Sequence, residues 1–386
     1  MAKSVSNGAI AQPPASKAGL YIALVVISLL TMILMVPSVF EWLRSNSLEV
    51  IITIRKDYSQ KNLDKLMDLI SAMGDKYGIF LALCCALAVL NMNNYLMLIG
   101  VSSFGVAVNL LVKMLIRDAR PYFYSPDYQP VSCDFEYGSP SGHGQSVTTF
   151  YLSFITLLVR QYGLQNKKLT LYVVGYSYCV FMCFTRIFVG LHTAEQLLLG
   201  FGLGLMIHIL FVHILVEYFD KLYEGIETGK TRLFNRYIVL LFLMVIFATL
   251  LYLYIERFDP APQYWLDTVK KSCPPSKHFI SFHYSCLNKY LVTFGSLGAY
   301  FGCYFRRWVL KFKDGSKFTK PKTVFKTVIR VLINIAFVVI LSVPSIFIPK
   351  TSPIPVLLFV KGFFVPFAAT FSSMLYTGKI VKFLNI

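Results

Sequence analysis

The sequence predicts an all-α protein, a polytopic transmembrane helix bundle of about ten spans. Two observations lead to this prediction. The 386 residues are 56% hydrophobic and 16% aromatic, and the mean hydropathy is above zero, which is unlike a soluble domain with a polar surface. Apolar runs of roughly 20 residues recur along the chain between charged loops, and one such run can cross a ~30 Å hydrocarbon core as a helix.

The N-terminal part divides into three segments. Residues 1–19, rich in Ser, Ala, Pro and Gln, lack the composition of a packed core and predict a flexible tail. Residues 20–40 predict a retained span, because the run is long for the apolar region of a signal peptide and no clear cleavage site follows. In residues 41–76, apolar and charged residues alternate at helical spacing, which predicts an amphipathic helix at the interface or against the bundle.

Nine further apolar runs predict the remaining spans, at 78–92, 95–116, 146–160, 169–189, 194–216, 237–255, 290–305, 331–348 and 355–376. Loop 306–330 contains nine Lys or Arg residues against the single acid Asp314, which predicts that it is cytoplasmic. If all ten runs cross, loops 117–145 and 190–193 both lie on the opposite face.

Three segments near that opposite face combine charge, imidazole and glycine. They are KMLIRDARP, YGSPSGHGQS and TRIFVGLHTAEQ, whose candidate site residues are Lys113, Arg120, Ser141, Gly142, His143, Arg186, His192 and Gln196. Because the predicted spans bring all three segments to one membrane face, we expect them to form one site.

In order and spacing these segments resemble the signature of the type-2 phosphatidic acid phosphatase and vanadium haloperoxidase superfamily. That signature is Lys, six residues, Arg-Pro; then Pro-Ser-Gly-His; then Ser-Arg, five residues, His, three residues, Asp. The first two parts match in full, and the third has Thr185 for Ser and Gln196 for Asp. The glucose-6-phosphatase branch is the most similar, since it shares RPYW-like and C-x4-GSPSGH stretches, here RPYFY and CDFEYGSPSGH, and also carries Gln.

The resemblance implies a six-helix phosphatase core over residues 77–216, preceded by an N-terminal span and amphipathic segment over 20–76. Additional C-terminal membrane helices follow over 217–386. It also implies an enzyme of the endoplasmic reticulum or another endomembrane, with its active site on the luminal face.

The resemblance assigns Lys113, Arg120 and Arg186 to a phosphate cradle. Three cations, two of them guanidinium forks, suit the oxygens of a phosphate group. Ser141 and Gly142 precede a long apolar run, so their backbone N–H groups are expected to point from a helix start toward the anion.

The two motif histidines are assigned the chemical steps. His143 has the position of the general acid that protonates the leaving oxygen, and His192 has the position of the nucleophile that forms a phosphohistidine. Arg186 assists as a catalytic cation. On a helix, positions i and i+4 share a face, so Gln196 is the expected orienting partner of His192, with Glu195 as the second candidate.

Several functions fit this pattern. The first is metal-independent hydrolysis of a phosphate monoester, either a lipid phosphate or a sugar phosphate such as glucose 6-phosphate. A polyprenyl (dolichyl) diphosphate phosphatase is an alternative, because such enzymes share HT-x-x-Q with the HTAEQ segment here. A catalytically inactive phosphate- or lipid-binding membrane protein or transporter is another, which Gln196 in place of Asp favours. Vanadate-dependent peroxidases resemble the motifs too, but those relatives are soluble.

Other classes of partner are not expected. The basic residues lie in short loops, where they suit topology and membrane lipid rather than nucleic acid. The eight cysteines have no metal-ligand spacing, so neither a metal nor another cofactor is expected. A disulfide between Cys273 and Cys286 is a hypothesis if their face is oxidising. The sequence leaves the oligomeric state open.

Overall fold

The computed structural model describes residues 17–124, 129–273, 281–308, 324–349 and 352–383. Every regular element in these ranges is a helix, which confirms the all-α prediction. The long and short helices are α1 (Lys17–Leu34), α2 (Pro37–Asp57), α3 (Lys61–Ser71), η1 (Ala72–Gly74), α4 (Lys76–Val89), α5 (Met92–Ile116), α6 (Pro121–Tyr124), α7 (Gly142–Tyr162), η2 (Gln165–Lys167), α8 (Lys168–Phe188), α9 (Ala194–Ile209), η3 (Leu210–Ile214), α10 (Val216–Thr228), α11 (Arg232–Phe258), α12 (Gln263–Ser272), α13 (Phe282–Thr293), α14 (Gly295–Trp308), α15 (Val324–Ile346), α16 (Ile354–Leu357), η4 (Leu358–Phe364) and α17 (Val365–Phe383).

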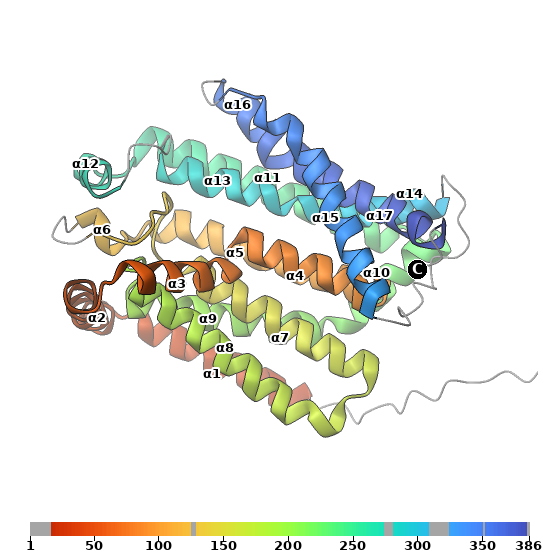
Figure 1. The fold of residues 1–386 in the computed structure, drawn as a ribbon, viewed down its shortest axis with the longest axis horizontal. Coiled ribbons are helices and arrows are strands. Elements are labelled where there is room, and N and C mark those ends of the chain that lie inside the picture. The colour runs from red at the N-terminus through yellow and green to blue at the C-terminus, as the bar shows by residue number, and fades with distance from the viewer. Residues whose placement is uncertain (1–16, 125–128, 274–280, 309–323, 350–351, 384–386) are drawn as a thin grey trace, which may run out of the picture.

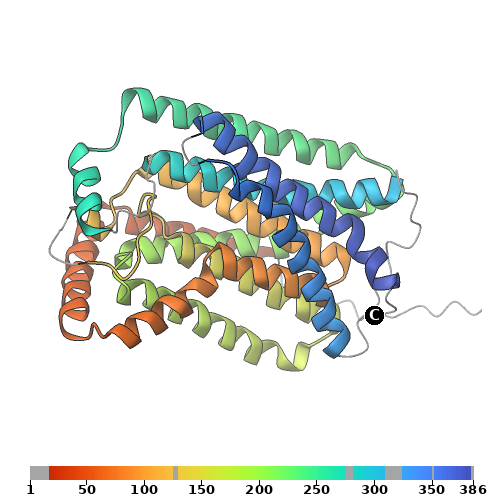
Figure 2. The ribbon, with the colours of Figure 1, turned by 45° about the horizontal axis from the view of Figure 1, so that its top comes forward.

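The long helices lie side by side in one bundle, and several short elements gather at one of its ends. Helices α2, α6 and α12 lie at the left end in Figure 1, whereas the C-terminus lies at the right. Figure 2 shows α12 covering the same left end from a second direction. The bundle therefore has one end closed by helices and loops, and the motif segments lie there.

Helix α5 is the centre of the bundle. Most of its side chains are buried, including Leu98, Val101 and Leu110, and the helix packs against α7, α9 and α13. A helix that is apolar nearly all round is stable only when neighbours cover every side. Because α5 is held in this way, its C-terminal end is a rigid support for the residues that follow.

Two glycines bring α9 against the start of α7. A Cβ at Gly200 would lie 2.4 Å from Ser141 O, and one at Gly204 would lie 2.8 Å from Gln145 O. Small residues spaced four apart permit close helix approach in membrane bundles. This packing fixes the loop before α7 relative to the start of α9.

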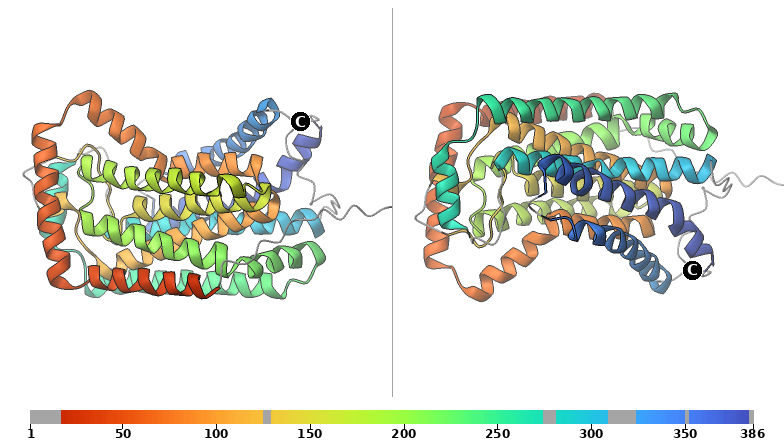
Figure 3. Two further views of the ribbon diagram at one scale, coloured as in Figure 1. Left: turned by 90° about the horizontal axis from the view of Figure 1, so that it is seen from below. Right: turned by 90° about the horizontal axis from the view of Figure 1, so that it is seen from above.

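The first predicted span is broken rather than continuous. Helices α1 and α2 meet at 74°, with Pro37 as the first residue of α2. Proline lacks the N–H that a continuing helix needs and suits the first helical position. As a result α2 runs across the end of the bundle, which Figure 3 shows from two sides. The predicted amphipathic segment 41–76 corresponds to most of α2 and to α3, which packs on α8.

The chain is an integral membrane protein, but the predicted count of ten spans is not confirmed. In the described ranges, five helices are long and apolar enough to cross a membrane, or up to seven if each of two bent pairs is one span. The expected span 290–305 is divided between α13 and α14. Residues 1–16 of the predicted tail and residues 309–323 of the basic loop lie outside the described residues. The predicted division into segments at 19, 76 and 216 stays a prediction.

Candidate active site

The three motif segments meet at the closed end of the bundle, each at the end of a helix. The residues are Lys113 in the last turn of α5, Arg120 before α6, Ser141 and Gly142 at the start of α7 with His143 in its first turn, Arg186 in the last turn of α8, His192 between α8 and α9, and Glu195 and Gln196 in the first turn of α9. Helix ends carry these side chains, so the bundle holds them rigidly, and most of them are buried.

The start of α7 is fixed by several polar contacts. Ser141 is the N-cap residue, and its Oγ accepts a hydrogen bond from Gly144 N at 3.3 Å. Ser141 N donates to Gln196 O at 2.8 Å, which joins α7 to α9. A Cβ at Gly142 would lie 3.8 Å from Glu136 Oε1 and 3.9 Å from Lys113 Cε, so this bare backbone lies beside both a carboxylate and a cation of the site. Backbone N–H groups at a helix start suit an anion.

Arg120 is buried and is the hub of the cluster. Its Nε donates to Glu136 O at 2.9 Å, and Nη1 donates to Leu191 O at 3.2 Å. Nη1 also lies 3.1 Å from His192 Nε2. The guanidinium thus links the loop before α7 to the loop that carries His192, and a lysine has no such fork.

Two carboxylates that sequence analysis did not single out neutralise the cations. Asp134 Oδ2 lies 2.9 Å from Arg186 Nη2 and 3.5 Å from Arg120 Nη1. Glu136 Oε1 lies 3.2 Å from Arg120 Nη2 and 3.8 Å from Lys113 Nζ. Burial alone would raise the pKa of each carboxyl, but the neighbouring cations hold both pKa values below their ordinary range. Both groups are therefore anions at neutral pH.

Lys289 is a fourth cation that the signature does not contain. It belongs to α13, which packs on α5, and its Nζ lies 3.1 Å from Glu136 Oε2. Ion pairing with Glu136 and Asp134 raises the pKa of this amine despite burial. No local pattern marks Lys289 in the sequence, because its place in the site depends on the packing of α13.

Lys113 and Arg186 are held by different elements. Lys113 Nζ donates to the carbonyl oxygens of Tyr137 and Gly138. Arg186 Nη1 donates to Ser71 Oγ at 2.6 Å, which ties α8 to the end of α3. Thr185, which stands in place of the signature Ser, donates within its own helix to Met182 O at 2.7 Å. The replacement of Ser by Thr therefore leaves the cluster of charges unchanged.

The imidazole of His192 has a defined tautomer. Gln196 Nε2 donates to Asp118 Oδ2 at 2.7 Å and to Ala119 O at 2.8 Å, so both amide hydrogens are used. Gln196 Oε1 consequently faces His192 Nδ1, at 3.0 Å, and accepts its N–H. Nε2 of His192 then carries the lone pair, which points toward Arg120. Burial, followed by the field of the nearby cations, lowers the pKa of His192 well below its ordinary value.

Glu195 does not contact the imidazole. Its carboxylate accepts a hydrogen bond from Thr193 Oγ1 and lies 3.6 Å from Arg44 Nε. Of the two predicted candidates, Gln196 is therefore the one that orients the imidazole of His192. A neighbouring position on a helix points about 100° away around the axis, which explains the difference.

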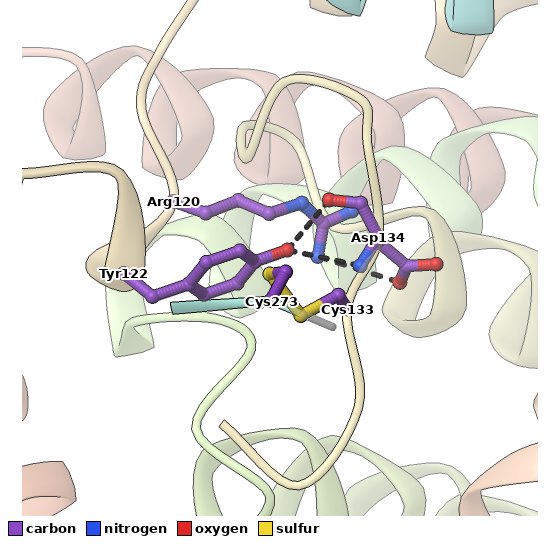
Figure 4. Close-up of a disulfide and its surroundings, with 5 residues drawn as sticks. All are labelled: Arg120, Tyr122, Cys133, Asp134 and Cys273. Carbon is purple, nitrogen blue, oxygen red and sulfur yellow. Dashed lines mark hydrogen bonds and ion pairs between the residues drawn. A yellow bond between two sulfur atoms is a disulfide. The ribbon is translucent and has the colours of Figure 1, made fainter. Parts of the chain in front are cut away.

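A disulfide joins Cys133 to Cys273, so the hypothesis of a bond between Cys273 and Cys286 is wrong. Cys286 is a free, buried thiol in α13. Figure 4 shows the disulfide beside Arg120, Tyr122 and Asp134. Tyr122 Oη accepts a hydrogen bond from Asp134 N at 3.0 Å. The disulfide and this hydrogen bond hold the loop segment that carries Asp134 against Arg120.

Among the described residues, no group of three or more His, Cys, Asp or Glu side chains is arranged to hold a metal ion.

His143 lies in the first turn of α7 and packs against η1, where a Cβ at Gly74 would lie 3.2 Å from His143 Cδ2. The site thus consists of cations, two carboxylates and two imidazoles, a composition suited to an oxyanion.

Residues 82–220, which contain all three motif segments, match the family model described as the PAP2 superfamily. This match covers the part of the chain that forms the candidate site. Human glucose-6-phosphatase 2 is 23% identical over 256 residues, which are 60% of this chain and 68% of the relative. The rat glucose-6-phosphatase catalytic subunit 1 is 25% identical over 228 residues, 52% of this chain and 60% of the relative. These similarities agree with the branch that the sequence motifs resemble.

A bacterial relative is similar over a shorter region. Phosphatidylglycerophosphatase B of Bacillus subtilis (strain 168) is 27% identical over 115 residues, 30% of this chain and 52% of the relative. A solved structure, described as a transmembrane PAP2 type phosphatidylglycerolphosphate phosphatase from Bacillus subtilis, aligns with a TM-score of 0.41 and 20% identity, over 53% of this chain and 95% of that chain.

Proposed function

We propose that this PAP2 protein is a membrane phosphohydrolase that removes phosphate from a phosphate monoester through a phosphohistidine intermediate. One observation carries the proposal. His192 Nδ1 is committed to Gln196 Oε1 at 3.0 Å, so the Nε2 lone pair lies at the meeting point of the cations, 3.1 Å from Arg120 Nη1. A neutral imidazole oriented toward an anion site is a nucleophile suited to phosphorus.

The charge of the cluster supports a dianionic substrate. The four cations Lys113, Arg120, Arg186 and Lys289 face the two carboxylates of Asp134 and Glu136. The excess of two positive charges equals the charge of a phosphate monoester at neutral pH. Phosphoryl transfer depends mainly on positioning and on such electrostatic stabilisation.

In the first step, His192 Nε2 attacks phosphorus and forms the N–P bond as the P–O bond to the leaving group breaks. Protonated His143 gives its proton to the leaving oxygen, and the alcohol departs. Because burial and the charge of Arg186 lower the pKa of His143, the negative charge of the bound phosphate is needed to hold this proton. In the second step, water attacks the phosphohistidine while His143 takes a proton from it. The N–P bond breaks, its electron pair returns to His192 Nε2, and inorganic phosphate leaves.

The substrate belongs to one of two classes, a sugar phosphate or a lipid phosphate. Relatives named glucose-6-phosphatase favour the first, and the relative named phosphatidylglycerophosphatase favours the second. We place the site on the non-cytoplasmic face of an endomembrane. The disulfide Cys133–Cys273 beside the site supports this side, because disulfides persist in oxidising compartments.

The test is phosphate release by the purified protein in lipid nanodiscs, with the parent beside His192→Ala. The substrates are glucose 6-phosphate, phosphatidate and a polyprenyl diphosphate. We expect the parent to release phosphate and to form an acid-labile phosphoprotein when quenched, and the variant to do neither. Turnover retained by folded His192→Ala would refute the nucleophile assignment.

A non-catalytic anion-binding protein is the competing outcome. The parent would then bind orthovanadate or inorganic phosphate without turnover on any substrate of the panel. Arg120→Ala would abolish binding in either case, so it serves as the control for an intact cradle.

A further inference from the structure

A buried carboxylate, that of Asp118, lies behind His192 and is linked to it through one intervening side chain, that of Gln196. Gln196 Oε1 accepts from His192, and Gln196 Nε2 donates to Asp118 Oδ2 at 2.7 Å. The side chain of Asp118 is 8% exposed, so this anion lies almost wholly inside the protein. The result is a continuous hydrogen-bonded chain from the imidazole through a neutral amide to a buried charge.

The backbone holds Asp118 in this place. Arg117 ends α5 in the left-handed region, at φ 51°, and the chain turns there before Asp118. Gly138 N then donates to Asp118 O at 2.8 Å. A Cβ at Gly138 would lie 2.4 Å from Gln196 Nε2, so the amide is also confined from its other side. The amide of Gln196 therefore has little room to turn away from Asp118.

Pairing with Arg44 is the simpler explanation for a buried aspartate here. Arg44 of α2 contacts Asp118 through Oδ1, and it also pairs with Glu41 and Glu195. The contact with Gln196 uses the other oxygen, Oδ2. Because each carboxylate oxygen has its own partner, anchoring α2 does not account for the second contact.

We infer that Asp118 is a positioning residue for His192, acting through Gln196. Its carboxylate orients the Gln196 amide so that the amide oxygen faces Nδ1, and its negative charge stabilises the cationic imidazole that develops when Nε2 bonds to phosphorus. A neutral glutamine alone supplies the hydrogen bond but not the charge. This role rests on the proposed nucleophile function of His192.

Besides Arg44, other titratable groups lie at this end of the bundle, and three of them are carboxylates. They are Lys113 and Arg120 from α5 and the segment after it, Arg186 from α8, Lys289 from α13, His143 from α7, Asp134 and Glu136 from the loop before α7, and Glu195 from α9. Glu136 is linked to Nε2 of the imidazole through Arg120, whereas Asp118 is the carboxylate linked to Nδ1, through Gln196.

The test is the titration of His192 by 15N NMR of histidine-labelled protein in nanodiscs, assigned with His192→Ala. This measurement needs no turnover. In Asp118→Asn we expect the His192 midpoint to fall by about half to one pH unit, because the cationic ring loses its anion. We expect kcat to fall about tenfold, because outer hydrogen-bond partners that orient a directly acting side chain typically contribute at least this much. Glu41→Gln removes an exposed partner of the same arginine and should leave the midpoint unchanged.

Gln196→Met keeps the side-chain length but breaks the chain at the amide. Adding Asp118→Asn to it should cause a smaller shift than Asp118→Asn causes in the parent, whereas equal shifts would mean that Asp118 does not act through the amide. An unchanged His192 midpoint in folded Asp118→Asn would overturn the inference. If the midpoint shifts but His192→Ala retains turnover, the positioning stands and the proposed nucleophile function fails.

Discussion

The carboxylate of Asp134 should compete with phosphate for the cradle. Its Oδ2 lies between two guanidinium groups, 2.9 Å from Arg186 Nη2 and 3.5 Å from Arg120 Nη1. Those donors are the ones that a phosphate oxygen would need. In the absence of substrate the carboxylate keeps two buried cations paired, since unpaired buried charge is costly. Substrate must therefore displace it.

The magnitude follows from the contacts that Asp134 makes. Hydrogen bonds to charged groups contribute about 1.5–3 kcal/mol each, and the side chain is 28% exposed, so water weakens the pair toward the lower value. Asp134→Asn removes the charge but keeps one acceptor oxygen. We expect an oxyanion to bind the variant about tenfold more tightly, equivalent to about 1.4 kcal/mol.

The assay is equilibrium binding of orthovanadate to the protein in nanodiscs, for the parent, Asp134→Asn and Asp64→Asn. Asp64 of α3 is the matched control. It pairs with Arg55 of α2 at 2.8 Å and has no contact with the cradle. Tighter binding in Asp134→Asn alone supports competition. Binding that is equal or weaker in Asp134→Asn, with the control unchanged, would show that the carboxylate helps to build the cradle instead.

Three further predictions follow from the same geometry. Because burial and neighbouring cations lower the pKa of His192, its neutral form persists as pH falls, so the acid limb of the kcat/KM profile should lie below pH 6.5; a limb above that value would contradict it. Gly138→Ala should reduce kcat about a hundredfold while the thermal midpoint changes little, because a Cβ would lie 2.4 Å from Gln196 Nε2 and displace the amide; wild-type kcat would refute this. Cys133→Ser and Cys273→Ser should each lower vanadate affinity, measured as above, and the double variant should be no worse than either single one.

The positions of the motif residues were predictable because each depends on local structure. The spacing from Lys113 to Arg120 spans the end of one helix, and the four-residue spacing from His192 to Gln196 belongs to the start of another. The segments meet at one end of the bundle, as the sequence predicted, but the ten spans on which that prediction depended are not confirmed.

The remaining charges of the site were not predictable, since they depend on packing between distant helices. Lys289 reaches Glu136 only because α13 packs against α5. The disulfide has the same origin: Cys273 and Cys286 are close in sequence, but the bond instead joins Cys273 to Cys133, 140 residues away. In α13, Cys286 is a free thiol buried in the hydrophobic core.

Pro37 is a different case, because its signal was present in the sequence. A proline within an apolar run usually marks a helix boundary. The run 20–40 nevertheless had the length of a span, and length decided the prediction. The helix break affects the surroundings of the site, because α2 begins at Pro37 and carries Arg44 to its contact with Asp118.

Gln196 is the departure from the signature that most favoured a loss of catalysis, and its surroundings argue otherwise. An amide that had only replaced a carboxylate would be free to present either its oxygen or its nitrogen to the imidazole. Here Ala119 O and Asp118 Oδ2 accept both amide hydrogens, so the oxygen is the atom that faces His192. The negative charge that the signature places directly beside the nucleophile is thus present one side chain further away.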